Sequence, residues 1–226
     1  MKHGKKYRET LKKYNFAVTY DLEKAMGMVK SMAFAKFDET VDLSVKLNLK
    51  KSQSVRDTVV LPHQFRGEKK ILVFCKPEKE KEAQEAGAAF VGADDLIEKV
   101  KGGWTDFDVA VATPDMMKDV GKLGMVLGRK GLMPNPKTGT VTFDLKGTLA
   151  ELKKGRTEFR ADKTGVVHLA VGKVSMEAEQ LAENIKAVMA EIKRKRPADA
   201  KGDFIKTISV ASTMGPGVWV SVAEQE

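Results

Sequence analysis

Three short apolar runs in the middle of this 226-residue chain constrain its fold more than any other feature. They are ILVFC at 71–75, AAFVG at 88–92 and DVAVAT at 108–113, and each is followed by a charged stretch of helical length. Continuous apolar runs of this length are typical of strands buried on both faces, as in a parallel sheet covered by helices. The segment 68–158 is therefore predicted to be a compact α/β unit with parallel strands.

The segments on either side of this unit have a different pattern. Residues 41–49 alternate apolar and polar side chains, which is typical of a strand with one buried face. Three further strands are predicted at 165–174, 204–213 and 217–222, and a long helix with an apolar stripe lies at 175–196. Because a lone strand or hairpin is only marginally stable in water, a four-stranded, helix-backed sheet built from both ends of the chain would accommodate all of them.

Two helices are predicted before the 41–49 strand. The basic stretch KKYRETLKKY, within the first sixteen residues, has its tyrosine and leucine side chains on one helical face. A second helix follows Asp21, a suitable N-cap residue, and is expected to continue to Phe37, where it gives way to the strand. For the long C-terminal helix, Ser175 and Ala178 supply only half of a capping box.

The chain is basic, and its charge is unevenly distributed. It carries 40 Lys and Arg against 31 Asp and Glu, which gives a formal net charge of +9 and a pI near 9.4. Residues 1–67 and 159–226 together account for +8 of this charge, whereas 68–158 carries +1. A polyanionic partner is therefore favoured, and it is expected to contact the terminal segments first.

The apolar runs are far shorter than the roughly 18 residues that span a bilayer. The basic N-terminus has no apolar h-region and no small-residue cleavage site, so it does not resemble a signal peptide. The single cysteine, Cys75, cannot form an internal disulfide, and within ILVFC it is expected to be a small buried hydrophobe. These features predict a soluble, cytoplasmic protein without a membrane partner.

No motif in the chain predicts catalysis, a cofactor or a metal site. The glycine-rich stretch 121–141 lacks a glycine immediately before Lys137, where the phosphate-binding Walker pattern requires one, and no GxGxxG occurs. His3, His63 and His168 are far apart and show no ligand spacing such as HxxxH. His168 is instead expected to be an ordinary strand residue.

Structural and RNA-binding roles both stay open for three segments. The stretch 121–141 is either a structured connector or a basic loop that contacts nucleic acid. Phe37, beside Lys36, has the character of a stacking platform for a base. Met214 and Gly215 lie in the turn STMGPG, where the backbone could closely approach another surface. From the residues alone, roles in the core are favoured for both turns by a narrow margin.

Five motifs resemble, in combination and in order, the signatures of the family of large-subunit ribosomal protein one in its bacterial form. They are AKFDETVDLSVKL, VATPDMM, GRKGLMPNPKTGTV, RADKTGVVHLAVGK and STMGPGV. The resemblance extends from HGKKYR to the last strand, and so covers essentially the whole chain. It implies two domains: an α+β sandwich made of both termini, 1–67 plus 159–226, and an inserted Rossmann-like, three-layer α/β domain at 68–158.

Members of this family form the mobile stalk beside the tRNA exit site. The resemblance therefore implies a non-catalytic constituent of the large ribosomal subunit, monomeric outside the ribosome, which uses no cofactor and binds large-subunit rRNA mainly through domain one. It also implies a role in releasing exit-site tRNA, and repression of the protein's own operon through an rRNA-like site in the mRNA. The alternatives are a nonspecific basic scaffold that binds any polyanion, and an α/β enzyme that uses the insert.

The residues implied to bind rRNA are those that match the family motifs. They are Lys36, Phe37 and Thr40 from AKFDET, and Thr207, Thr213, Met214 and Gly215 from the last strands and their turn. Short polar groups, an aromatic ring and open backbone suit the shallow minor groove of RNA and its 2′-hydroxyls. Lys46 and Arg56 are expected to attract phosphates, in a salt-dependent way.

One segment departs from the family pattern. In RDTVVLPHQ, Asp57 and Gln64 stand where the family usually has glycine. The local backbone, or the hinge between the domains, is therefore expected to differ here, and Arg56 and His63 carry less weight as site residues.

Overall fold

The computed structural model describes residues 4–12, 14–15, 17–50, 53–67, 69–197 and 202–221. The chain forms two compact units, which we call the terminal unit, Met1–Phe65 with Glu158–Glu226, and the inserted unit, Arg66–Thr157. His3, and Val222 at the end of the strand predicted at 217–222, lie outside the described residues.

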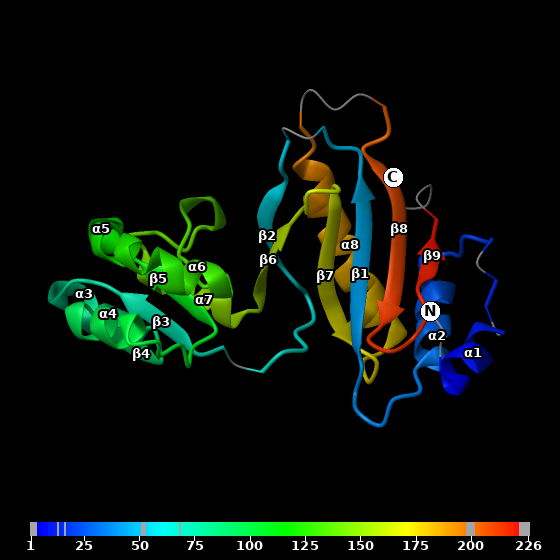
Figure 1. The fold of residues 1–226 in the computed structure, drawn as a ribbon, viewed down its shortest axis with the longest axis horizontal. Coiled ribbons are helices and arrows are strands. Elements are labelled where there is room, and N and C mark those ends of the chain that lie inside the picture. The colour runs from blue at the N-terminus through cyan, green and yellow to red at the C-terminus, as the bar shows by residue number, and fades with distance from the viewer. Residues whose placement is uncertain are drawn as a thin grey trace. The chain divides into compact units, whose positions relative to one another are not determined.

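The terminal unit is built on an antiparallel sheet whose strands come from both ends of the chain. Its strands lie in the order β7 (Val166–Lys173), β1 (Thr40–Leu47), β8 (Ile205–Ser212) and β9 (Val218–Val220). The strand from the N-terminal half, β1, therefore lies between two strands from the C-terminal segment, as Figure 1 shows. This is the four-stranded sheet that the alternating patterns predict.

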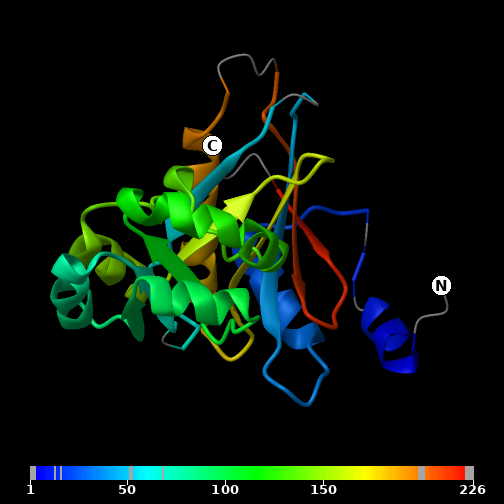
Figure 2. The ribbon, with the colours of Figure 1, turned by 60° about the vertical axis from the view of Figure 1, so that its left-hand side comes forward.

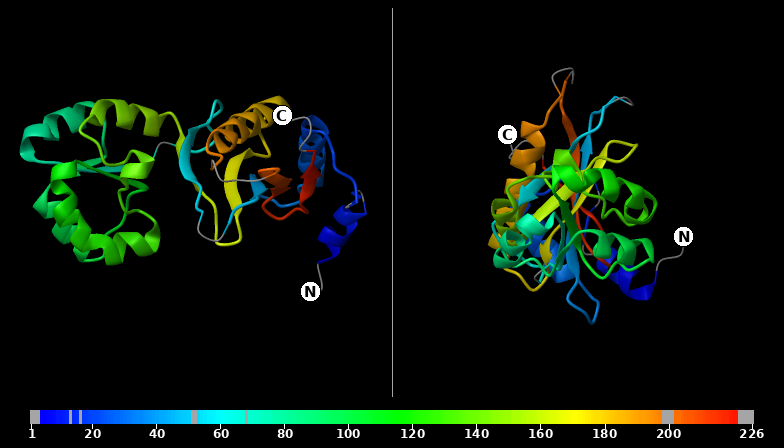
Figure 3. Two further views of the ribbon diagram at one scale, coloured as in Figure 1. Left: turned by 90° about the horizontal axis from the view of Figure 1, so that it is seen from above. Right: turned by 90° about the vertical axis from the view of Figure 1, so that its left-hand side faces the viewer.

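One face of this sheet is buried and the other is open. Along β1, side chains alternate between half-buried and buried, and Val41, Leu43 and Val45 point into the core. Helices α2 (Leu22–Met32) and α8 (Ala178–Arg194) lie together on the buried side of the sheet (Figure 3), where their apolar stripes complete one hydrophobic core. The opposite face carries mainly polar side chains, and none of the described helices contributes its apolar stripe to that face.

Two helix boundaries differ from those expected. Helix α2 ends at Met32 rather than Phe37, and the chain turns into extended conformation at Ala33. Helix α8 does begin with a full capping box, but Glu177 and Gln180 form it instead of Ser175 and Ala178. Residue types next to the helix ends suggested other boundaries. The chain after α2 is instead held by the Glu39 carboxylate, which binds the N–H groups of Phe34 and Ala35, and α8 is capped by the Glu177 carboxylate.

The remaining elements of the terminal unit are short. Helix α1 spans Lys5–Leu11, and β2 (Arg56–Val60) pairs with β6 (Arg156–Arg160) in a separate two-stranded sheet.

Asp57, which stands where the family usually has glycine, has its Oδ2 atom 2.6 Å from Lys195 Nζ. Burial opposes ionisation of Asp57, but the Lys195 ammonium and the Thr58 N–H outweigh it and lower the pKa of this carboxyl. No described non-glycine residue has a positive φ, so neither Asp57 nor Gln64 is strained by lacking glycine's freedom.

The inserted unit has a parallel sheet between two layers of helices. The strands lie in the order β4 (Phe90–Gly92), β3 (Ile71–Phe74) and β5 (Val109–Ala112), and all pairs are parallel. One layer contains α3 (Pro77–Glu85) and α7 (Leu145–Lys153), and the other contains α4 (Asp94–Lys101), α5 (Met117–Val120) and α6 (Gly124–Lys130). The left panel of Figure 3 shows these layers on either side of the strands.

This arrangement, with the mixed terminal unit, confirms the predicted fold class. Cys75 is fully buried directly after β3, and burial raises the pKa of its thiol to about 11, as expected for a small core residue.

The stretch 121–141 contains α6 and short 3-10 turns at 121–123 and 136–138, rather than one open loop. Gly131 and Gly139 adopt φ of 72° and 66°, where a side chain would be strained, so both glycines end helical turns.

Asn184 provides a test of how the segment after β2 is held to the core. Its fully buried amide accepts a hydrogen bond from the His63 N–H at 2.9 Å and donates to the carbonyls of His63 at 2.9 Å and Val171 at 2.8 Å. Asn184→Ala leaves these groups without a partner, so we expect a loss of about 2–3 kcal/mol in the free energy of unfolding, measured in urea. The control is Lys186→Ala, an exposed position on the same helix; equal losses in the two variants would contradict this role.

Candidate nucleic-acid interface

Two loops from distant parts of the sequence meet at one end of the terminal unit's sheet. We call residues 33–39 and 213–217 the paired loops; both views in Figures 1 and 2 place them at the same end of β1 and β8. Their junction is hydrogen-bonded, because Thr40 N donates to Thr213 Oγ1 at 2.9 Å and Thr213 N donates to Thr40 O at 3.0 Å. Phe37 and Met214 therefore lie on adjacent loops.

A buried carboxylate holds the paired loops together. Glu39 is only 1% exposed, and its Oε1 accepts hydrogen bonds from the backbone N–H of Phe34 at 3.0 Å and of Ala35 at 2.8 Å. Its Oε2 accepts from Met214 N at 3.0 Å, on the other loop. Burial opposes ionisation of this group, but the N–H donors outweigh that effect, so the pKa of Glu39 lies below its usual value.

Further polar contacts fix the first loop against β7 and the chain that follows it. The Asp38 carboxylate accepts hydrogen bonds from Ser175 N at 3.1 Å and from Ser175 Oγ at 2.8 Å. Lys173 Nζ donates to Thr40 Oγ1 at 3.0 Å and to the Asp38 carbonyl at 3.3 Å. Three strands therefore contribute to the frame that positions the paired loops.

The side chains that these loops present are exposed and of mixed character. Phe37 is 56% exposed and Met214 is 50% exposed. The Met214 N–H donates to Glu39, and the loop that carries Phe37 is bound to the same carboxylate through the N–H groups of Phe34 and Ala35. Lys36 is exposed beside them. At Gly215 a Cβ atom would lie 2.4 Å from Ser212 Oγ, so the tight turn explains this glycine without reference to a ligand. The result is an aromatic ring, a thioether and a cation held on a rigid support.

The open face of the sheet continues from the paired loops as a surface of short polar side chains. Ser44 lies opposite Ser209 on one side and His168 on the other, and its Oγ is 2.9 Å from His168 Nδ1. Lys46 lies opposite Thr207 at the far end of the same face, and its ammonium donates to the Thr164 carbonyl. Lys46 is six positions after Thr40 along β1, which is about 20 Å at ~3.3 Å per residue.

The structure thus groups most, but not all, of the predicted residues. Lys36, Phe37, Thr40, Thr213, Met214 and Gly215 gather at the paired loops, and Lys46 with Thr207 lies on the same face at a distance. Arg56 belongs to neither group: it lies on β2, where its Nε is 2.5 Å from Glu158 Oε1, so its charge is already compensated.

Sequence reasoning missed Glu39 and Lys173. A signal for Glu39 was present, because the alternation that buries Val41 and Leu43 also directs residue 39 to the core side. A carboxylate at such a position needs donors from elsewhere, and the paired loops provide them. Lys173 had no comparable signal, since its partners are 133 and 135 positions away in the sequence.

We expect Glu39→Gln to lower the free energy of unfolding at pH 7 by about 1–3 kcal/mol, as measured in urea. Both carboxylate oxygens accept N–H groups, so an amide NH2 in either orientation would face a donor. The lowered folded-state pKa means that this stabilisation is present above the unfolded pKa, near 4.3, and is lost as the pH falls through the folded value.

The control for this experiment is Glu179→Gln, which removes an exposed carboxylate from the same unit. The difference in stability between the wild type and Glu39→Gln should stay constant from pH 7 to about 5 and narrow as the pH is lowered further, below about 4. A difference that stays constant in this lower range as well, or that Glu179→Gln reproduces, would contradict the assigned role of Glu39.

Among the described residues, no three His, Cys, Asp or Glu side chains converge as a set of metal ligands. None of the described helices combines the length and apolar character needed to span a membrane.

Comparisons with known proteins agree in pointing to one family. Residues 29–216 match the model of the ribosomal protein L1p/L10e family. Large ribosomal subunit protein uL1 of Treponema denticola is 66% identical over 220 residues, which are 97% of this chain and 97% of that protein. The proteins of the same name from Treponema pallidum and Leptospira biflexa are 58% identical over 226 residues and 57% identical over 224 residues. These alignments cover 100% of both chains for T. pallidum, and 99% of this chain and 97% of its relative for L. biflexa.

Proposed function

This chain belongs to the ribosomal protein L1p/L10e family, which is not a family of enzymes, and we propose that it is a constituent of the large ribosomal subunit that binds large-subunit rRNA. The surface that binds the RNA is the paired loops together with the open face of the β7–β1–β8–β9 sheet. The protein acts in the cytoplasm, on the ribosome, and is a monomer outside it.

The observation that carries this proposal is the hydrogen bonding of Glu39 to both paired loops. Because one buried carboxylate binds N–H groups on each loop, Phe37 and Met214 are presented together, and neither needs to be ordered when RNA binds. A preordered surface avoids the entropic cost of fixing loops on association. The aromatic ring and the short hydroxyl groups of Thr40 and Thr213 suit the shallow RNA minor groove.

The cations of the surface have different roles. Lys36 is exposed on the first loop and Lys46 lies at the far end of the open face. In this proposal the two lysines contact phosphates on either side of the bound RNA helix. Arg56 contributes less, because its guanidinium is already paired with Glu158. The net charge of +8 on the terminal segments supplies a general, salt-dependent attraction.

Two finer functions follow from the same surface. A site that recognises the contours of folded rRNA also binds an mRNA that copies those contours, so we propose that the protein represses translation of its own operon in this way. As part of the mobile stalk, it also assists the release of tRNA from the exit site. Both functions rest on the family resemblance and on the assigned RNA surface.

The alternative is a basic scaffold that binds any polyanion. A filter-binding titration with a stalk rRNA fragment and with a duplex of scrambled sequence separates the two, because only a scaffold binds both equally at moderate salt.

Met214→Asp tests the paired loops directly. A carboxylate placed against phosphate-rich RNA is repelled and loses hydration, so we expect rRNA affinity to fall by about 2 kcal/mol or more, roughly 30-fold, in filter binding. The matched control is Met125→Asp, since Met125 is 85% exposed on the inserted unit. Both changes are on the surface and should leave stability unaltered; an equal fall in affinity, or no fall in Met214→Asp, would remove Met214 from the site.

Deleting the inserted unit tests whether the terminal unit alone carries the binding surface. The terminal unit has its own core of apolar residues, and every contact described above for the paired loops lies within it. We therefore expect a chain with a short glycine linker between Phe65 and Glu158 to bind the rRNA fragment within about tenfold of the intact protein, since non-contacted regions contribute little binding energy. A folded variant, judged by circular dichroism and cooperative unfolding, that fails to bind would contradict this assignment.

A further inference from the structure

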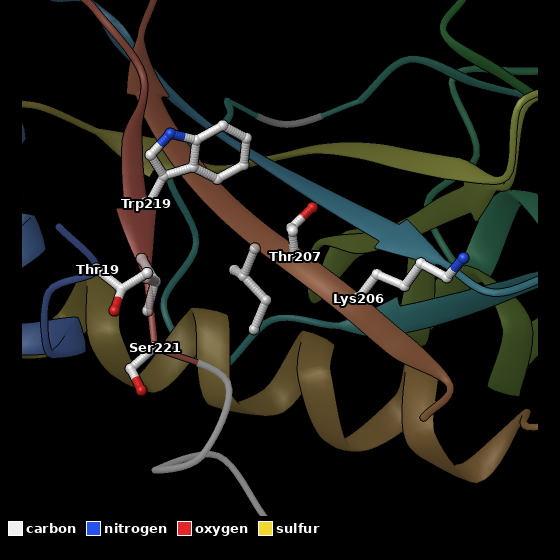
Figure 4. A pocket seen from close by; sticks show the side chains of 7 residues that line it. Thr19, Lys206, Thr207, Trp219 and Ser221 are labelled. Atoms are coloured by element: carbon white, nitrogen blue, oxygen red, sulfur yellow. The ribbon is translucent and has the colours of Figure 1, made fainter. Parts of the chain in front are cut away.

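A hollow beside the open face is lined by an exposed tryptophan, a lysine and three hydroxyl groups. Its volume is about 360 Å³, within the roughly 300–1,000 Å³ range of small-ligand sites. It is lined by Thr19, Lys206, Thr207, Ile208, Trp219, Val220 and Ser221 (Figure 4). All of these residues belong to the terminal unit, and the family motifs assign only Thr207 among them to RNA binding.

The indole of Trp219 forms one wall of the hollow. Trp219 lies opposite Ser209 in the β8–β9 pairing, so its side chain is on the open face, and it is 38% exposed. The outer edge of β9 is paired with Tyr20, whose N–H donates to the Trp219 carbonyl and whose carbonyl accepts from the Ser221 N–H. These bonds fix the edge strand that carries the ring. A large aromatic face at a fixed strand position is a stacking platform.

A β-bulge directs Lys206 to the other side of the hollow. Lys46 pairs with Thr207, but the next residue of β1, Leu47, pairs with Ile205, so Lys206 is an additional residue on β8. A bulge of this kind changes the direction of a side chain, and both Lys206 and Thr207 are exposed as a result. The bulge thus exposes Lys206 at the end of the hollow opposite the indole, and in Figure 4 its ammonium extends away from Trp219.

The chemistry of the lining favours a nucleotide. None of the lining side chains is acidic, the single charge is that of Lys206, and the hydroxyls of Thr19, Thr207 and Ser221 can each donate and accept. A nucleotide offers a flat base for the indole, a ribose hydroxyl for the threonine and serine groups, and a phosphate for the ammonium. Thr207 also lies opposite Lys46 on the proposed rRNA surface, so the hollow is continuous with it.

We propose that this hollow binds an unpaired RNA nucleotide, whose base stacks on Trp219 while its phosphate contacts Lys206. The inference rests on the proposed rRNA binding and extends it: the paired loops and open face dock on a helical region, and the Trp219 hollow captures a single-stranded nucleotide beside that helix. Stacking on an aromatic face tolerates any base, so the site selects unpaired RNA rather than a sequence.

Tryptophan fluorescence provides a direct test. The chain has two tryptophans, and Trp104 lies on the inserted unit against Phe90 and Phe107. In the full-length Trp104→Phe variant, Trp219 is the only tryptophan, and single-stranded heptauridylate should quench its fluorescence. In otherwise wild-type protein, Trp219→Ala should lower heptauridylate affinity at least about fivefold, and Trp219→Phe should retain most of it, because a phenyl ring still stacks. Trp104→Phe is the matched control and should bind as the wild type does.

Met214→Asp separates this site from the proposed function. That variant should lose rRNA affinity but keep the heptauridylate affinity, because Met214 does not line the hollow. If the wild type does not prefer the rRNA fragment to a scrambled duplex, the proposed function fails, whatever the Trp219 signal. Three results would overturn the nucleotide site. Heptauridylate could leave Trp219 fluorescence unchanged, Trp219→Ala could bind heptauridylate as tightly as the wild type does, or an acidic peptide could quench Trp219 fluorescence where the RNA does not.

Discussion

The pairing of β1 between β7 and β8 is the interaction on which the rest of the terminal unit depends. Because β1 comes from the N-terminal half and both partners come from the C-terminal segment, the sheet forms only when the two ends of the chain meet. The same pairing sets which side chains face the core and which face solvent, since a slip of one residue would exchange the two sets. It also fixes Lys46 opposite Thr207 and brings Thr40 to Thr213, so one register determines both the core and the proposed RNA surface.

Glu39 shows how an exposed surface can be ordered without being covered. A loop normally gains its order by burying apolar side chains, but Phe37 and Met214 are both about half exposed. Here the order comes from backbone N–H groups that bind a carboxylate on the core side of the sheet, where leaving that charge unpaired would be costly. The loops therefore keep the apolar groups of Phe37 and Met214 exposed, and their order depends on a residue that is itself buried.

The parts of the fold that periodicity specifies could be predicted from the sequence. Alternation located β1, continuous apolar runs located the strands of the inserted unit, and an apolar stripe located α8. The end of α2 could not be predicted, because it depends on hydrogen bonds that Phe34 and Ala35 make to Glu39 rather than on a helix-breaking residue. Long-range pairing limited the prediction of site residues in the same way. The charge of Arg56 is compensated by the carboxylate of Glu158, 102 positions away in the sequence, and no local pattern reveals this pair.

The charge of the open face bears on how this surface would discriminate between polyanions. Asp42 lies between Thr40 and Ser44 on that face, in the centre of the sheet, so the face is not uniformly cationic. A carboxylate there repels phosphate, yet it can accept a hydrogen bond from a 2′-hydroxyl or a base amino group. A nonspecific scaffold gains nothing from such a residue, whereas a surface that docks on one RNA shape uses it to reject backbones placed in the wrong register. On the proposed RNA surface, the general attraction would then come from the net positive charge of the terminal segments, and the selectivity from the mixed charges of the face.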